Sequence, residues 1–157
     1  MATRYAASTK VPLDRSRAEI ERTVTRYGAT AFGYMSGGTD AAIVFEIANR
    51  RVMFRVPLPD RRAREFTHTP ERGARRRPEA AEELRQQAVM QRWRALALVI
   101  KAKLEAVAAG ITTVEQEFLA HIVLPDGHTT VGTWMAPQLA AAYDAGTMPA
   151  LLPGVSE

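Results

Sequence analysis

Residues 29–56 read ATAFGYMSGGTDAAIVFEIANRRVMFRV, and this stretch decides the fold. Two apolar runs, 29–35 and 41–48, flank the turn-rich segment SGGTD at 36–40, a pattern typical of two antiparallel strands. A third run, 51–56, follows so closely that only a tight turn at Asn49 and Arg50 can connect it. The stretch therefore predicts a three-stranded antiparallel β-meander.

The register of the second hairpin follows from that turn. With Asn49 and Arg50 as its two residues, the facing pairs on one side are Ile47 with Val52, Phe45 with Phe54 and Ile43 with Val56. This apolar face predicts the core. The opposite face carries Val44, Glu46, Ala48, Arg51, Met53 and Arg55. It is either a solvated face with cross-strand ion pairs, or a secondary basic binding face built on Arg51 and Arg55.

Downstream, residues 79–109 predict one long amphipathic helix. Pro78 suits the first helical position, and acidic residues in the first turns favour the positive end of the helix dipole. Its apolar stripe consists of Val89, Trp93, Leu96, Ile100, Leu104 and Val107, and Gly110 ends it. At ~1.5 Å per residue the helix is roughly 45 Å long, which exceeds the sheet. The surplus stripe needs either another helix or a second copy of the chain, so we expect a homo-oligomer.

Shorter helices complete an α+β fold, in which the meander packs on the long helix. A capping box at Ser16 predicts a helix over 16–27, preceded by a flexible arm at 1–13. Thr112 and Thr113 offer two overlapping caps for a helix through Phe118 and Ile122, before a turn at 125–127. Pro137 is expected to open a last helix over 138–145. We expect one domain over 14–152 and a tail at 153–157.

The charge of the chain is concentrated in residues 57–78. This segment has seven arginines against Asp60, Glu65 and Glu71, a balance of +4 that equals the net charge of the whole chain. Its prolines predict a mobile surface loop, and loops of this length are commonly functional. The chain has 18 arginines and three lysines, a preference that a GC-rich genome also produces. The placement of the charge is therefore more informative than its amount.

A basic loop on an apolar scaffold suggests an anionic partner, and nucleic acid is the first candidate. The expected binding residues are Arg61, Arg62, Arg64, Phe66, Arg72, Arg75, Arg76 and Arg77. Arginines would contact phosphates, and Phe66 would stack on a base or, alternatively, anchor the loop to the core. The competing interpretation is an inhibitor module that docks the same arginines on an acidic surface of a host protein.

Other function classes find little support. The absence of cysteine excludes disulfides and thiolate chemistry. No nucleophile and base pattern is recognisable, so a catalytic role is not assigned and no cofactor is expected. If the protein were an enzyme, Glu46, Glu117 and His121 would be the first residues to test. Glu117, His121 and His128 could approach one metal ion, but the two-histidine helix motif of zinc enzymes is missing. No apolar run approaches membrane-spanning length, and we expect a cytoplasmic protein without a membrane partner.

Several stretches carry a resemblance to known proteins. They are RYGATAFGY (26–34), VPLPD (56–60), QRWRALALVIKAKLEAV (91–107), GITT (110–113) and EFLAHIVLPDG (117–127). Together they resemble small uncharacterised proteins encoded by bacteriophages and prophages of GC-rich bacteria. The order of a meander and a long helix also looks like the core of phage single-strand annealing proteins. The resemblance implies a phage setting and carries over no catalytic residue. We therefore expect a non-enzymatic phage accessory protein that binds nucleic acid, with single strands as the expected ligand.

Overall fold

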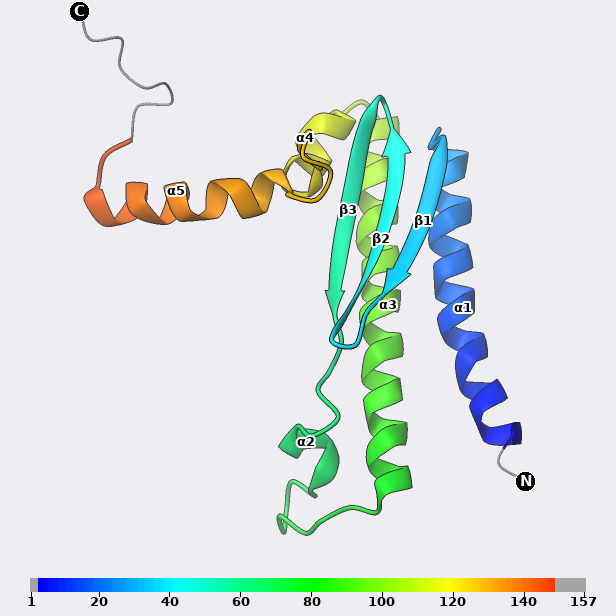
Figure 1. The fold of residues 1–157 in the computed structure, drawn as a ribbon. Helices are drawn as coiled ribbons and strands as arrows, with labels where there is room; N and C mark the ends of the chain where they lie inside the picture. The colour runs from blue at the N-terminus through cyan, green and yellow to red at the C-terminus, as the bar shows by residue number, and fades with distance from the viewer. Residues whose placement is uncertain (1–2, 149–157) are drawn as a thin grey trace, which may run out of the picture.

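The computed structural model of the protein describes residues 3–148 and has the expected α+β architecture. A three-stranded antiparallel sheet in the order β1-β2-β3 forms one layer, and two long helices that run side by side in the same direction form the other (Figure 1). The strands are β1 (Ala31–Ser36), β2 (Asp40–Ile47) and β3 (Arg50–Pro57). The helices are α1 (Thr3–Arg26), α2 (Arg64–Thr67), α3 (Pro78–Ala108), α4 (Val114–Phe118), the 3-10 turn η1 (Leu119–His121) and α5 (Val131–Ala145).

The β2–β3 hairpin has a different register from the predicted one. Ala48 and Asn49 form the turn, both with positive φ (49° and 57°), and Phe45 pairs with Val52 rather than with Phe54. A shift of two residues leaves every side chain on its predicted face, so the apolar pattern alone cannot distinguish the two registers. The outer face does distinguish them, because the observed register sets Glu46 opposite Arg51 and Val44 opposite Met53.

The core lies between the sheet and the two long helices, as the apolar pattern predicts. The predicted inner face is buried: Ile43, Phe45, Ile47, Val52, Phe54 and Val56. Trp93, Ile100 and Leu104 from α3 pack against it, with Ile20 and Val24 from α1 and Phe118 from α4. Phe118 meets Phe45 and Phe54 edge to face, at 5.8 and 6.1 Å between ring centres. Each such fully buried side chain contributes roughly 1.5–3 kcal/mol to folding.

The N-terminal prediction was wrong. α1 begins at Thr3, so the arm expected over 1–13 is helical from Thr3 onward, and the cap expected at Ser16 lies inside the helix. The physical reason is tertiary: Ile20 and Val24 are held against α3, and a helix anchored at its C-terminal half extends backward at little extra cost. α1 also packs against much of the apolar stripe of α3 that the sheet is too short to cover.

The C-terminal part contains one more correction. Thr113 and Gln116 form the expected capping box of α4, and Asp126 closes the expected turn. However, α5 begins at Val131 with Thr130 as its cap, so Pro137 lies inside the helix instead of opening it. Gly146 ends α5 with φ 65°, one residue after the predicted end of the helix at 145. Residues 149–157, which include the predicted tail, lie outside the described residues.

Among residues 3–148, no helix is long and apolar enough to cross a membrane.

Candidate nucleic-acid interface

The Arg-rich segment, residues 57–78, is folded rather than an open loop. It contains the single turn of α2 and an antiparallel bridge between His68 and Arg75, and it lies at the end of α3 that is remote from α4 and η1 (Figure 1). Thr69 accepts a hydrogen bond from the Gly73 backbone N–H (2.9 Å) and donates its own N–H to the Ala74 carbonyl (2.8 Å). The segment was predicted as a surface loop without regular structure; it contains the helical turn α2 and local backbone hydrogen bonds, and the rest of it is irregular.

Phe66 holds this segment against α3. The ring comes from the centre of α2 and is only 7% exposed. A ring in this position cannot stack on a base, and of the two alternatives the anchoring one agrees with the structure. Burial of the ring fixes the flanking arginines relative to the rest of the protein.

Most arginines of the segment present free guanidinium groups. Arg62, Arg64, Arg72, Arg75 and Arg77 are exposed, and in the described part of the chain none of them forms an ion pair. Phosphate groups bind such unpaired, solvated cations without first displacing a carboxylate. The structure thus brings together five of the predicted arginines as available cations.

The other two arginines of the segment are engaged. Arg61 lies 3.9 Å from the carboxylate of Glu82, although its side chain is 74% exposed. Arg76 is half-buried and donates from Nε to the backbone carbonyl of His68 (3.3 Å). Arg76 therefore contributes to the fold of the segment through Nε, and its role as a phosphate contact stays a prediction.

The secondary basic face is neutralised. Arg51 donates to Glu46 Oε1 (2.9 Å), and Arg55 lies 3.5 Å from Asp40. These are the cross-strand ion pairs of a solvated face, so Arg51 and Arg55 are not free cations. Together with Arg50, which reaches Glu115 on α4 at 3.3 Å, they form a group of paired arginines at the sheet.

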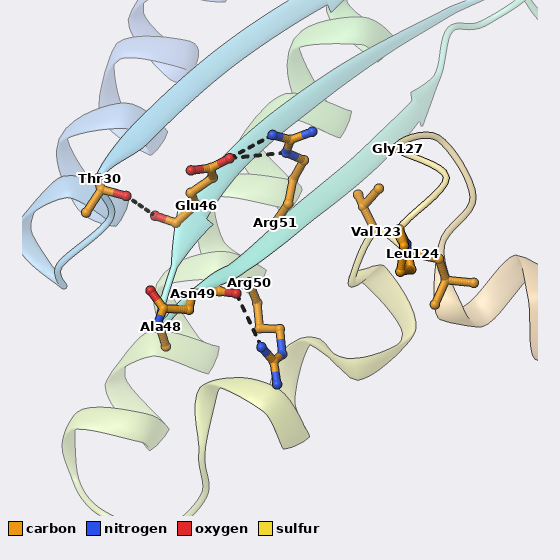
Figure 2. A pocket seen from close by; sticks show the side chains of 10 residues that line it. Thr30, Glu46, Ala48, Asn49, Arg50, Arg51, Val123, Leu124 and Gly127 are labelled. Carbon is orange, nitrogen blue, oxygen red and sulfur yellow. Dashed lines mark hydrogen bonds and ion pairs between the residues drawn. The ribbon is translucent and has the colours of Figure 1, made fainter.

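The cavity beside these residues offers no chemistry of its own. It has a volume of about 460 Å³ and lies between the β2–β3 turn and the loop at 123–127. Figure 2 shows its one carboxylate, Glu46, joined to Arg51, with the Thr30 hydroxyl on the Glu46 backbone carbonyl. The Glu46 carboxylate and the guanidinium groups of Arg50 and Arg51 already have partners, so no nucleophile and base arrangement is formed.

Glu117 and His121, the other residues to test for catalysis, have structural partners too. Lys103 donates to the backbone carbonyl of Glu117 (2.8 Å) and to its carboxylate (3.2 Å), which ties α4 to α3. His121 stacks on Phe54 at 3.9 Å between ring centres. Burial, and then the charge of Lys103, lower the pKa of His121.

In the described residues no group of three acidic or histidine side chains is placed to hold a metal ion.

A second cavity adjoins the Arg-rich segment. It could not be predicted from the sequence. It has a volume of about 300 Å³, and Tyr34, Leu58, Arg85 and Trp93 are among its lining residues. These residues come from β1, the start of the segment and α3, so no spacing along the chain could indicate that they meet. Trp93 was predicted correctly as buried, but its place in a cavity wall depends on the packing of four parts of the fold, because Leu13 of α1 also lines the cavity.

Comparisons of the chain with protein-family models, with curated proteins and with solved structures found no match. The structure shows an α+β domain with a basic, folded segment at one end of its longest helix.

Proposed function

We propose that this protein is a non-enzymatic accessory protein of a phage or prophage that binds nucleic acid without sequence preference, with single strands preferred. The binding surface is the Arg-rich segment, with Arg62, Arg64, Arg72, Arg75 and Arg77 as its phosphate contacts. The phage setting is carried by the sequence resemblance alone.

One observation supports the binding proposal above others: the difference in pairing between two groups of arginines. The arginines at the sheet, Arg50, Arg51 and Arg55, all lie against carboxylates. Apart from Arg61, the exposed arginines of the segment form no ion pair among the described residues, although Glu65 and Glu71 lie in the same stretch of sequence. Free cations gathered on one folded segment favour a polyanion, since every phosphate contact releases a counterion.

The shape of the segment favours a single strand over a duplex. A duplex is read in its major groove by a helix or a two-stranded ribbon. α2 has four residues and its ring Phe66 faces inward, so the segment offers no helix that could lie in the groove. A single strand is flexible enough to follow irregularly spaced cations.

The test is a fluorescence anisotropy titration with a labelled single strand and with its duplex. The key variant replaces Arg72, Arg75 and Arg77 by alanine and keeps Arg76, because Arg76 supports the fold of the segment. The matched control replaces Arg50, Arg51 and Arg55 by alanine, which removes the same charge from the sheet. We expect the key variant to lose at least about tenfold in affinity at low salt and the control to bind like the native protein.

Two results would contradict the proposal. Absence of binding at low salt would turn the search toward an acidic protein surface as the partner. Equal losses in the key variant and the control would mean that only net charge matters and that the segment is not a site.

A further inference from the structure

α5 is a helix without a buried residue and almost without charge. None of its residues is buried, and Asp144 is its one charged side chain. Trp134, Leu139 and Tyr143 are 54%, 56% and 80% exposed. A helix with apolar residues around most of its circumference is normally covered by other parts of a protein. In the part of the chain that the structure describes, nothing covers α5 beyond its first turns.

The first turn of α5 is fixed on η1, and the rest of the helix leads away from α3 (Figure 1). The Val131 N–H donates to the Ile122 carbonyl (2.9 Å). Gly132 lies so close to η1 that a Cβ there would be 2.8 Å from the Ala120 carbonyl oxygen, so only glycine allows this approach. Because this turn is held, α5 does not fold back onto the other helices of its own chain.

α3 has an exposed face that matches α5 in polarity and in charge. Leu98 is 62% exposed, and Ala95 is exposed beside it on the same face. Arg94 and Lys101 flank Leu98 at a spacing of four and three residues, and both are exposed. Among the described residues neither of them forms an ion pair, and the same is true of Asp144. The one charge of α5 is thus opposite in sign to the two charges beside Leu98.

The surface of the chain is larger than that of a compact monomer. The chain exposes 11582 Å² in total. With residues 1–12 and 149–157 counted as fully exposed, at about 160 Å² each, the other 136 residues expose at least about 8,200 Å². A compact chain of that length exposes roughly 7,000 Å². The excess of about 1,000 Å² is comparable with the ~800 Å² that each partner buries in a stable interface of ordinary size.

We infer that two copies of the chain exchange α5, so that α5 of each copy lies on the α3 face around Leu98 of the other. The contact is reciprocal about a two-fold axis, so it closes at two chains and covers both apolar surfaces in each of them. Asp144 then lies beside the cations that flank Leu98. A nucleic acid does not fit α5 as a partner, because the helix has no basic residue to contact phosphates.

The contact is tested by cross-linking, since the chain has no cysteine of its own. The double variant Leu98→Cys, Leu139→Cys places one thiol on the α3 face and one on α5. Under mild oxidation we expect it to form covalent dimers on a non-reducing gel. Each single variant, and the control pair Ala80→Cys, Leu139→Cys, should give about tenfold less, because Ala80 is exposed on α3 about 27 Å from Leu98 and a disulfide needs a close approach.

The charge match is tested by reversal and rescue. Asp144→Lys should weaken the dimer by about 2- to 30-fold, because each dimer contains two such contacts. Lys101→Glu added to the same chain should restore the native Kd. The matched control Glu83→Lys makes the same charge change at an exposed position near the other end of α3 and should leave the Kd unchanged. Analytical ultracentrifugation measures the Kd, and circular dichroism shows that each variant is folded.

Three results would overturn the inference. They are a mass of one chain at all concentrations, equal cross-linking of the Leu98 and Ala80 pairs, and a loss of affinity in Asp144→Lys that is absent or that Lys101→Glu does not restore. None of them bears on strand binding by the Arg-rich segment, which lies at the other end of α3 (Figure 1).

Discussion

At the scale of single residues, the protein is organised by which polar side chains have partners. Arg51, Arg55 and Lys103 are paired with carboxylates of the described residues. Arg72 and Arg75 have no ion pair within the described residues and are available for a ligand. Sequence composition could predict that the basic segment is charged. It could not predict which arginines are engaged, because each pairing depends on tertiary distances.

Asp126 provides a prediction about pH. The hydroxyl and N–H of Thr129 and the N–H of His128 donate to its carboxylate and lower its pKa from 3.8 to about 2. Because the folded form resists protonation, the group stabilises the fold above pH 3.8, and this contribution is lost as the pH falls toward 2. Asp126→Asn should therefore lower the melting temperature at pH 7, and its difference from the native protein should shrink between pH 4 and pH 2.

Thermal unfolding followed by circular dichroism at a series of pH values measures this difference. A difference that stays constant down to pH 2 would contradict the role assigned to the carboxylate.

At the scale of elements, the periodic apolar patterns correctly predicted which faces lie in the core. They did not predict where each helix or turn begins. The inner face of β2 and β3 is buried as predicted, and of the predicted stripe of α3 Trp93, Ile100 and Leu104 are buried. The start of α1, the start of α5 and the β2–β3 turn were misplaced, because packing against α3, the Thr130 cap and cross-strand pairing decided them. Each of these effects is tertiary or involves a choice between two local signals of similar strength.

The turn itself can be tested by stability. Ala48 and Asn49 both have positive φ, which favours Asn at the first position and Gly at the second. The double variant Ala48→Asn, Asn49→Gly should therefore raise the free energy of unfolding by about 0.5–1 kcal/mol. Urea denaturation measures the change, with Asn49→Ala as a control that should be destabilising. A double variant less stable than the native protein would place the turn elsewhere.

At the scale of the whole molecule, two features lie far apart. The Arg-rich segment lies at the N-terminal end of α3, and α5 projects away from the opposite part of the protein, next to α4 (Figure 1). α5 exposes Trp134, Leu139 and Tyr143, and α3 exposes Leu98. The sequence predicted more apolar surface on α3 than the sheet can cover, and α1 and α2 cover part of it. The expectation of a homo-oligomer now rests on the apolar side chains that remain exposed.

Self-association stays a prediction with a direct test. Light scattering coupled to gel filtration should give a mass above the 17.3 kDa of the single chain. Leu98 is 62% exposed on α3, so Leu98→Glu should shift the equilibrium toward the monomer by placing a charge in the contact. A mass of one chain for the native protein at all concentrations would contradict the prediction.

The central claim is that free arginines of the segment bind the phosphates of a single strand, and its salt dependence tests this most directly. The measurement is the slope of log K against log salt between about 50 and about 200 mM, for the native protein and for the variant lacking Arg72, Arg75 and Arg77. Five phosphate contacts predict a slope of about −3.5, which the variant should reduce in magnitude by about 2. A native slope near zero, or one that the variant leaves unchanged, would contradict the claim.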